Sequence, residues 1–483
     1  MKVTINNKYA LIIEKECAYI FFAGNIGDLK DANTQMVSYI PPFLGFILSY
    51  FNGNEMDETL DKISQKFKIN IGKLKTFVNN CFQNENAYIS EYNGIKTIIP
   101  PFFLTIGDVK SKIRIASNAA ISDKFNMHRL NYPAYLNIMI TSKCLANCIY
   151  CYADRSRKDD MKQEEIFSLI ENAHKTGIIN VNISGGDIFA VNDWKQILKK
   201  LSECSYSSLL STKIPLDDSD IAYLKSLKIN KIQFSLDSIN SNTIHTLLRL
   251  NGQDYLKKFY KSIEAFEKYD VKLDIKTVLT RYNDSVENIT EMYNLFSKFK
   301  CISSWNIMPA FKSEYKCNFN DYRYNREKIN IIYQYLSKLH PNFEVFYKGL
   351  QATHKEQYLS VDEFLLKNKI CSANNYSLSV LSNGMATFCE MLYYNDFFYV
   401  GDVKKQTISE IWNSEKSYYF YRFENHKTTK SKCNECRSSK VCKFGSEKKI
   451  CVADIVKAYG SNKWDYPDPR CPQAKKIDLE TII

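Results

Sequence analysis

Residues 135–309 constrain the fold most, because short apolar runs alternate there with amphipathic helical patterns. Apolar residues that recur three or four positions apart predict a helix, whereas short runs of branched and aromatic residues predict a strand. A regular alternation of the two predicts parallel β/α units. We expect six strands, at residues 135–141, 178–183, 207–212, 231–235, 274–280 and 303–309.

Six β/α units predict a partial (β/α)6 TIM-like barrel, and we place this α/β domain at residues 135–340. One intervening helix covers residues 165–175, with Ile166, Leu169 and Ile170 on a single face. In barrels of this kind the C-terminal strand ends and the loops that follow them carry the chemistry. We therefore expect the reactive residues directly after the predicted strands.

The loop after the first predicted strand contains three cysteines in a Cys144-x3-Cys148-x2-Cys151 arrangement. Cysteine thiolates hold iron-sulfur clusters, and a closed structural cluster or zinc site has four protein ligands. A set of three leaves one iron of a four-iron cluster open to a substrate or cofactor. A zinc knuckle or an incidental group of cysteines is the alternative interpretation.

In this position the three cysteines resemble the signature of the radical S-adenosylmethionine (SAM) superfamily, and the resemblance covers about residues 135–340. It implies a [4Fe-4S] cluster whose open iron binds the amino and carboxylate groups of SAM. It also implies that an electron from this cluster cleaves SAM to methionine and a 5′-deoxyadenosyl radical, which takes a hydrogen atom from the substrate.

The same resemblance extends to residues that contact SAM. Ser184-Gly185-Gly186-Asp187 follows the second predicted strand, where the family commonly carries Gly-Gly-Glu near the SAM amino group. Two glycines allow close backbone approach, and the Asp187 carboxylate is able to accept a hydrogen bond from an ammonium group. Three further contacts are implied: Tyr150 with adenine, Ser235 with ribose and Arg249 with the SAM carboxylate. Ser235 is alternatively a strand-end cap, and Arg249 a surface residue.

A second group of cysteines lies near the end of the chain, where the β/α alternation has stopped. Its members are Cys371, Cys389, Cys433, Cys436, Cys442, Cys451 and Cys471. Their layout resembles the SPASM domain, which we place at residues 371–483, after a bridging region at 341–370. The eight residues between Cys442 and Cys451 are more than that family usually has, and an insertion explains the difference.

The SPASM resemblance implies two auxiliary [4Fe-4S] clusters, which brings the expected total to three. The implied ligand sets are Cys433, Cys436, Cys442 and Cys471 for one cluster, and Cys371, Cys389 and Cys451 for the other. Cys317, Cys301 or no protein group completes the second set, and an open iron there would bind a substrate thiolate. One or two zinc ribbons are the alternative.

The first 105 residues predict a winged-helix-like α+β domain. Apolar patterns predict a strand pair at 9–14 and 17–23, followed by three helices at 44–51, 60–67 and 74–82. Asn93-Gly94 predicts a tight turn between two further strands, at 87–92 and 95–99. Residues 106–134 are expected to be a connector.

This arrangement resembles the PqqD-like domains that recognise the leader segment of a precursor peptide. An extended leader would add a strand to an exposed sheet edge. A DNA-binding winged helix has a similar pattern, but residues 74–82 and their neighbours carry no dense Lys/Arg recognition face. We therefore expect a peptide rather than nucleic acid as the partner.

Composition predicts a cytoplasmic protein without a membrane span. The N-terminus lacks an uninterrupted apolar signal-peptide core, and the longest apolar stretch, 39–51, is too short to cross a bilayer. Metal ligation explains the 15 cysteines better than disulfides do, although Cys17 and Cys81 lie on apolar faces and are expected in the core. The net charge of +12 comes from scattered Lys and Arg, which predict a solvated surface.

These patterns together predict a radical SAM maturase of a ribosomally synthesised precursor peptide, with formation of a cysteine thioether as the leading reaction. Glu390, beside Cys389, is a candidate catalytic base, although a solvated carboxylate is the simpler interpretation. An electron donor such as flavodoxin or ferredoxin is the expected protein partner. The alternatives are a carbon-carbon peptide cyclase, a sulfatase-type maturase that generates formylglycine, and a non-enzymatic metal-cluster sensor that binds DNA.

Overall fold

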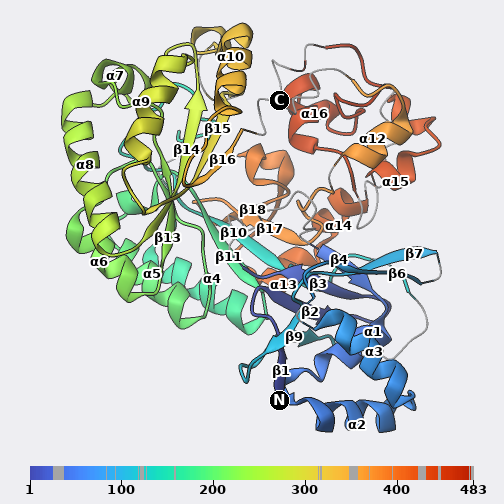
Figure 1. The fold of residues 1–483 in the computed structure, drawn as a ribbon. Coiled ribbons are helices and arrows are strands. Elements are labelled where there is room, and N and C mark those ends of the chain that lie inside the picture. Colours follow the sequence, from blue (N-terminus) through green and yellow to red (C-terminus); the bar gives the residue numbers. More distant parts are fainter. Residues whose placement is uncertain are drawn as a thin grey trace. The chain divides into compact units, whose positions relative to one another are not determined.

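The computed structural model contains two compact units. The first comprises Met1–Tyr135 with His174–Asn180, and the second comprises Leu136–Ala173 with Val181–Ile483. Figure 1 labels the helices and strands of both units. The residues described are 1–24, 37–82, 84–92, 94–117, 119, 125–126, 128–156, 159–313, 315, 318–347, 357–368, 370–393, 395–422, 431–443, 448–477 and 479.

A four-stranded sheet forms the larger sheet of the first unit. Its order is β4 (Val37–Ile40), β3 (Ala18–Phe22), β2 (Tyr9–Ile13) and β9 (Lys112–Ile115). The predicted strand pair is present, because β2 and β3 pair antiparallel. β9 pairs parallel with β2, although it belongs to the segment expected to be a connector. Lys112 and Arg114 alternate with Ile113 and Ile115, but four residues are too few for this period of two to predict a strand, so the pairing with β2 reveals it.

Three helices of the first unit agree with the predicted ones: α1 (Pro42–Ser49), α2 (Met56–Phe67) and α3 (Ile71–Cys81). Their Leu48, Leu60 and Val78 side chains are buried in one core. The side chain of Asn70 caps α3 by accepting hydrogen bonds from two backbone N–H groups of its first turn. Cys17 and Cys81 are fully buried, as predicted for core residues.

The first unit also contains a three-stranded sheet that the sequence pattern did not predict, in the order β5 (Asn52–Glu55), β1 (Lys2–Ile5), β8 (Leu104–Ile106). These strands are three or four residues long, too short for a period of two residues to show. The predicted hairpin is present as β6 (Tyr88–Tyr92) and β7 (Ile95–Ile99). Gly94 of its turn has a φ of +77°, and Asn93 lies outside the described residues.

A five-stranded parallel sheet dominates the second unit. Its order is β12 (Ser211–Thr212), β13 (Lys231–Ser235), β14 (Lys272–Leu279), β15 (Ile302–Pro309) and β16 (Glu344–Phe346). Every pair is parallel, so the α/β fold predicted from the alternation is confirmed. β16 belongs to the segment expected to be a bridging region. Its three residues are too few to predict a strand, and the parallel pairing with β15 makes it one.

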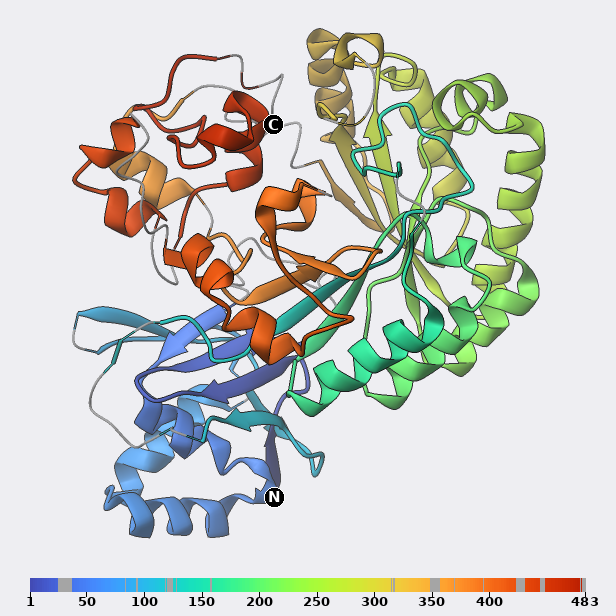
Figure 2. The same ribbon diagram turned by 180° about the vertical axis from the view of Figure 1, so that it is seen from behind.

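Helices connect these strands: α5 (Trp194–Glu203), α6 (Asp218–Ser226), α7 (Ser241–Leu248), α8 (Gly252–Lys268), α9 (Val286–Phe296) and α10 (Arg326–Leu336). α8 shows why they pack, because its Tyr255, Phe259, Ile263 and Phe266 recur at helical spacing and are buried. Figures 1 and 2 show the helices outside the strands, which leaves the strand ends for the site.

The first two predicted β/α strands belong to a different sheet. Its order is β11 (Asn180–Gly185), β10 (Tyr135–Thr141), β17 (Ser377–Val380), β18 (Met385–Thr387) and β19 (Tyr399–Asp402). The hydrogen-bonded ladder stops between β11 and β12, because β12 is only two residues long. β10 instead pairs with the hairpin that carries Cys371 before β17 and Cys389 after β18. Backbone pairing thus connects the two cysteine-rich regions.

Short helices and turns form the remainder of the second unit: α12 (Val361–Lys367), α13 (Ile408–Trp412), α14 (Glu415–Arg422), α15 (Ser439–Lys443) and α16 (Val452–Tyr459). An aromatic cluster packs α14 against the residues after β18 and after α16: its members are Phe388, Phe398, Phe420 and Trp464, with Phe420 5.2 Å from Trp464 between ring centroids. Within the ranges given above, no helix is both long and apolar enough to cross a membrane.

Candidate active site

The loop of Cys144, Cys148 and Cys151 begins three residues after β10 ends and is held at several points. The Asp160 carboxylate accepts hydrogen bonds from Thr141 Oγ1 at 2.6 Å and from the backbone and hydroxyl of Ser142, both at 3.1 Å. The guanidinium of Arg155 donates to the Ala146 carbonyl at 2.7 Å. These hydrogen bonds constrain the backbone of the loop and thereby the positions of its three cysteines.

The carboxyl end of α7 supports the same loop from another side. The backbone N–H groups of Asn147 and Ile149 donate to the carbonyls of Leu248 at 2.9 Å and Leu247 at 3.0 Å. These carbonyls belong to the last turn of the helix and have no partner within it. Arg249 follows directly, is exposed and has a left-handed backbone with φ 59°. The residue predicted to bind the SAM carboxylate is thus adjacent to the cysteine loop.

Burial and neighbouring charges define the chemistry of the three thiols. Burial raises the pKa of Cys144, and raises that of Cys148 to about 12, while the Lys213 ammonium opposes the shift at Cys148. Charges on Cys144 and Cys151 also act on Cys148, so the three thiols lie near one another. Soft cationic iron would ionise such thiols on binding, because metal ligation lowers a thiol pKa. A donor set of three thiols, one of them buried beside a lysine, fits an iron-sulfur cluster with one open iron.

The glycine pair after β11 packs against the cysteine loop. Gly186 N–H donates to the Thr141 carbonyl at 2.7 Å, and Asp187 N–H donates to the Lys143 carbonyl at 2.8 Å. A Cβ on Gly186 would lie 1.8 Å from the Lys143 carbonyl oxygen, which no side chain tolerates. Gly185 has a φ of +119°, a conformation that only glycine adopts without strain. The close approach of the Lys143 backbone thus requires glycine at position 186, and the positive φ requires glycine at position 185.

Replacing Gly186 with alanine is expected to lower the free energy of unfolding by about 1–3 kcal/mol, because the added methyl group forces the cysteine loop away from β11. Denaturant unfolding of the full chain measures this change. Gly72→Ala is the matched control, since an added Cβ meets only the Asn70 side chain at 3.1 Å and lies within α3. Equal stability of Gly186→Ala and the parent protein would contradict the close packing.

Asp187 has protein partners that the sequence did not predict. Its buried carboxylate accepts hydrogen bonds from Thr212 Oγ1 at 2.7 Å and from the Phe189 N–H at 3.0 Å. Burial is the main cause that raises its pKa. These bonds connect the end of β11 to β12. A role of Asp187 in holding the SAM amino group stays a prediction.

Lys213 contacts two residues that the sequence indicated, Tyr150 and Ser235. The sequence did not indicate Lys213 itself. Its Nζ donates to the Tyr150 hydroxyl and to Asp237 Oδ2, both at 2.8 Å, and lies 3.5 Å from the Ser235 carbonyl. The Tyr150 hydroxyl also donates to Asp237. Asp237 has a fully buried side chain, so this lysine balances its charge. Lys213 directly follows β12, and the strand-end rule alone would have indicated it.

Replacing Lys213 with methionine is expected to slow SAM cleavage by about tenfold or more, because an uncompensated buried Asp237 carboxylate costs about 3–5 kcal/mol and Cys148 loses a neighbouring cation. The rate of 5′-deoxyadenosine formation and the iron bound per chain measure the effect. Lys199→Met, at an exposed position of α5, removes the same charge elsewhere. An unchanged rate in Lys213→Met would rule out this electrostatic support.

Two cysteine groups in the C-terminal region correspond to the predicted ligand sets. Cys433, Cys436, Cys442 and Cys471 line one small cavity, together with Lys443 and Asp468. Burial raises the pKa of Cys471 to about 11, with a contribution from the neighbouring Cys433. The structure thus brings together the four cysteines that the sequence assigned to one cluster. Their role as ligands stays a prediction.

Cys371, Cys389 and Cys451 form the other group, because each of the first two acts electrostatically on Cys451. Burial raises the pKa of Cys389 to about 12, and Lys448 opposes the shift. Lys448 is buried and donates to the Ala373 carbonyl at 2.9 Å, while its own carbonyl accepts from Cys371 N–H at 2.8 Å. Nothing in the sequence pattern indicated this lysine.

Asp468 connects the two groups of C-terminal cysteines. Its Oδ2 accepts from the Cys451 N–H at 2.8 Å, and the residue also lines the four-cysteine cavity. Arg470 pairs with it at 3.0 Å and with Asp454. In the described ranges, no three His, Cys, Asp or Glu side chains have the arrangement to hold a single metal ion. Ligands of a four-iron cluster bind different irons, so they stand further apart than ligands of one ion.

Cys301 is not a fourth ligand of this group, which corrects one of the options left open by the sequence. It lies directly before β15 begins, whereas the cysteine loop follows the end of the strand β10. Its Sγ is buried 3.9 Å from the Ile263 carbonyl, and its N–H donates to Glu267 at 2.7 Å, both on α8. Cys317, the other option, lies outside the described residues.

An aromatic group separates the first cysteine loop from Cys389. Tyr152 follows Cys151, and its ring lies 6.4 Å from Tyr393 and 5.7 Å from Phe311 between centroids. Glu390 directly follows Cys389 and acts electrostatically on both tyrosines. Burial raises the pKa of Glu390. The sequence missed both tyrosines, because neither occupies a recognisable motif.

Family models match two segments of the chain. The model of the radical SAM superfamily matches residues 138–293, and that of the SPASM iron-sulfur cluster-binding domain matches residues 371–437. The chain contains a radical SAM domain followed by a SPASM domain. Both resemblances seen in the sequence are confirmed at this level, and with them SAM and iron-sulfur clusters as the expected cofactors. The PqqD-like resemblance of residues 1–105 stays a prediction.

Curated relatives align with parts of this chain. GTP 3′,8-cyclase of Clostridium botulinum is 26% identical over 175 residues, which are 34% of this chain and 53% of that protein. The chain thus spans about half the length of these first relatives. The cysteine-type anaerobic sulfatase-maturating enzyme of Clostridium perfringens is 23% identical over 338 residues, 63% of this chain and 86% of that enzyme.

The radical SAM and SPASM chain has the fold of a solved structure from Streptococcus suis. SuiB bound to S-adenosylmethionine has a TM-score of 0.63 and 16% identity, and the match covers 97% of this chain and 100% of SuiB. SuiB bound to the precursor peptide SuiA has a TM-score of 0.61 and 16% identity, covering 96% and 98%. At this identity the likeness shows a common fold.

Proposed function

We propose that this protein is a radical SAM maturase that installs a crosslink in a ribosomally synthesised precursor peptide, with a cysteine thioether as the leading product. One observation carries the proposal: the ring of Tyr152, next to Cys151, lies 6.4 Å between centroids from that of Tyr393, four residues after Cys389. A substrate at this aromatic group would contact both cysteine sites. The SuiB fold supports the proposal, since SuiB has been solved with a precursor peptide.

Three [4Fe-4S] clusters and SAM are the proposed cofactors. When bound to Cys144, Cys148 and Cys151, the first cluster with SAM supplies the radical that removes a hydrogen atom from the substrate. Gly185 and Gly186 let the backbone approach SAM closely, while Tyr150, Ser235 and Arg249 contact its adenine, ribose and carboxylate. Flavodoxin or ferredoxin is the proposed electron donor.

The substrate is held and deprotonated by residues beside the second group of cysteines. Tyr152, Tyr393 and Phe311 provide aromatic walls that exclude water and orient a peptide side chain. The Glu390 carboxylate accepts the proton that the substrate loses. Cys371, Cys389 and Cys451 would hold an auxiliary cluster, which would supply an electron acceptor or a binding site for the substrate thiolate.

The first unit is proposed to bind the leader of the precursor peptide. β8 is an edge strand of its three-stranded sheet and β9 an edge strand of the other. Ile106 at the end of β8 and Val109 after it are 57% and 66% exposed. Exposed apolar residues along a sheet edge suit an extended peptide that adds a strand there.

Sulfatase-type maturation is the second candidate function, because the C. perfringens enzyme aligns over most of its length. It would use the same cysteines and Glu390 to oxidise a protein cysteine or serine to formylglycine. A carbon-carbon peptide cyclase would also use the same residues. The two peptide reactions and the sulfatase reaction differ in the mass and thiol content of their products.

The deciding experiment uses the full chain, reconstituted anaerobically with iron and sulfide. Reductant, SAM and a cysteine-containing precursor peptide encoded beside the gene are added, and the products are analysed by mass spectrometry. A thioether removes two hydrogen atoms and one alkylatable thiol, a carbon-carbon bond removes two hydrogen atoms and leaves the thiol, and formylglycine loses the sulfur. Bound zinc without 5′-deoxyadenosine would refute the enzyme and favour the DNA-binding sensor.

A further inference from the structure

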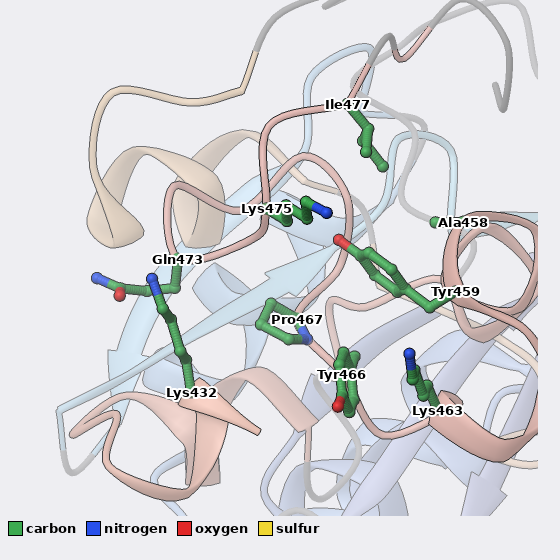
Figure 3. Close-up of a pocket in the computed structure, with 9 residues that line it drawn as sticks. All are labelled: Lys432, Ala458, Tyr459, Lys463, Tyr466, Pro467, Gln473, Lys475 and Ile477. Atoms are coloured by element: carbon green, nitrogen blue, oxygen red, sulfur yellow. The ribbon is translucent and has the colours of Figure 1, made fainter. Parts of the chain in front are cut away.

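A cavity of about 570 Å³ lies beside the carboxyl end of α16 (Figure 3). Its volume is within the range of sites that hold small organic ligands. The proposed reaction uses none of its residues. They are Lys432, Ala458, Tyr459, Lys463, Tyr466, Pro467, Gln473, Lys475 and Ile477.

Hydrogen-bond donors dominate the polar part of this cavity. Lys432, Lys463 and Lys475 contribute three ammonium groups, and no Asp or Glu is among the lining residues. Figure 3 shows the ends of Lys463 and Lys475 and the hydroxyl of Tyr459 around the same space. Lys463 Nζ lies 5.6 Å from the centroid of the Tyr466 ring. The cavity therefore carries a positive charge that no lining side chain balances.

The hydroxyl of Tyr459 indicates that a ligand in this cavity would carry a hydrogen-bond acceptor. This oxygen is buried and has no hydrogen-bond partner among the residues that the structure describes. A buried hydroxyl without a partner is unfavourable, and a bound hydrogen-bond acceptor would remove this cost. Lysine ammonium groups only donate, so they cannot accept the phenol proton. A group with several anionic oxygens would satisfy Tyr459 and the lysines together.

Apolar residues form the other wall of the cavity. Ala458, Pro467 and Ile477 offer contact area to a carbon skeleton, which a bare inorganic ion does not use. We propose that this cavity binds a small organic anion whose phosphate or carboxylate group is held by Lys463, Lys475 and Tyr459. The site is separate from that of SAM, and the proposal does not depend on the reaction that the protein catalyses.

The cavity also borders the four-cysteine group. Pro467 and Gln473 line both this cavity and the small one that contains Cys433, Cys436, Cys442 and Cys471. A bound anion would therefore lie one residue layer from that group. The protein must be tested with its iron-sulfur content reconstituted, so that these walls have their native form.

Isothermal titration of the reconstituted full chain tests the proposal, with phosphoenolpyruvate and citrate as phosphate and carboxylate probes. We expect saturable binding of at least one probe at one site per chain. The Lys463→Gln/Lys475→Gln double variant should weaken it by about tenfold or more, and Tyr459→Phe by about tenfold, because each removes a charge-assisted donor. Tyr459→Phe keeps the ring and so tests the hydroxyl without a large packing change.

The matched control is Lys257→Gln/Lys258→Gln, which removes two exposed positive charges from α8 and should leave affinity unchanged. Iron content and thermal unfolding confirm that each variant is folded. Absence of saturable binding, affinity that survives the Lys463/Lys475 change, or an equal loss in the α8 control would overturn the proposal. Binding of a glutamate-rich peptide but of neither small probe would also overturn it, in favour of a peptide-docking surface.

Discussion

Replacing Cys148 with alanine is expected to reduce 5′-deoxyadenosine formation to background, a loss of at least about 10³-fold. Cys148 is the most buried of the three loop cysteines and lies next to Lys213. Two remaining thiolates cannot hold a four-iron cluster with an open iron, so SAM has no site at which to be cleaved. Iron analysis and product chromatography after anaerobic reconstitution measure the effect.

Cys204→Ala is the matched control for this change. Cys204 caps the carboxyl end of α5, outside every proposed ligand set, and its removal should leave both iron content and SAM cleavage unchanged. The Cys148→Ala protein should lose about four irons per chain, while the C-terminal cysteines keep theirs. Continued SAM cleavage by Cys148→Ala, or an equal loss in Cys204→Ala, would contradict the assignment of the loop.

Replacing Glu390 with glutamine is expected to stop crosslink formation by at least about 10²-fold while 5′-deoxyadenosine is still formed. Glutamine has the same size as glutamate, so it keeps the contacts of Glu390 in η4 (Glu390–Leu392) but cannot take a proton. Hydrogen abstraction depends on the first cysteine loop and should continue. The ratio of modified peptide to 5′-deoxyadenosine therefore measures the role of Glu390.

An exposed glutamate near another cysteine pair provides the control for Glu390. Glu435 lies between Cys433 and Cys436 and is exposed. Glu435→Gln therefore removes one negative charge beside proposed cysteine ligands, as Glu390→Gln does, but at the protein surface. Its product ratio should equal that of the parent protein. If Glu390→Gln also keeps the parent ratio, Glu390 is not the base and a solvated carboxylate is the correct interpretation.

The sequence predicted the elements whose patterns are long or strict. β10, β13, β14 and β15 lie within two residues of their predicted limits, and α1, α2 and α3 of the first unit follow the predicted apolar spacing. Short strands such as β1, β8, β9 and β16 escaped prediction. They contain three or four residues, and pairing with a neighbour rather than local preference makes them strands.

The sequence by itself determined the kinds of ligand present, because cysteine spacing and the position of Cys144, Cys148 and Cys151 after a strand are local properties of the chain. Only the tertiary structure decided which distant groups share a site. It brought Lys213 to Tyr150 and Asp237, paired Tyr152 with Tyr393, and removed Cys301 from the site. The physical reason is that burial and hydrogen bonding between remote residues depend on packing, which no local pattern encodes.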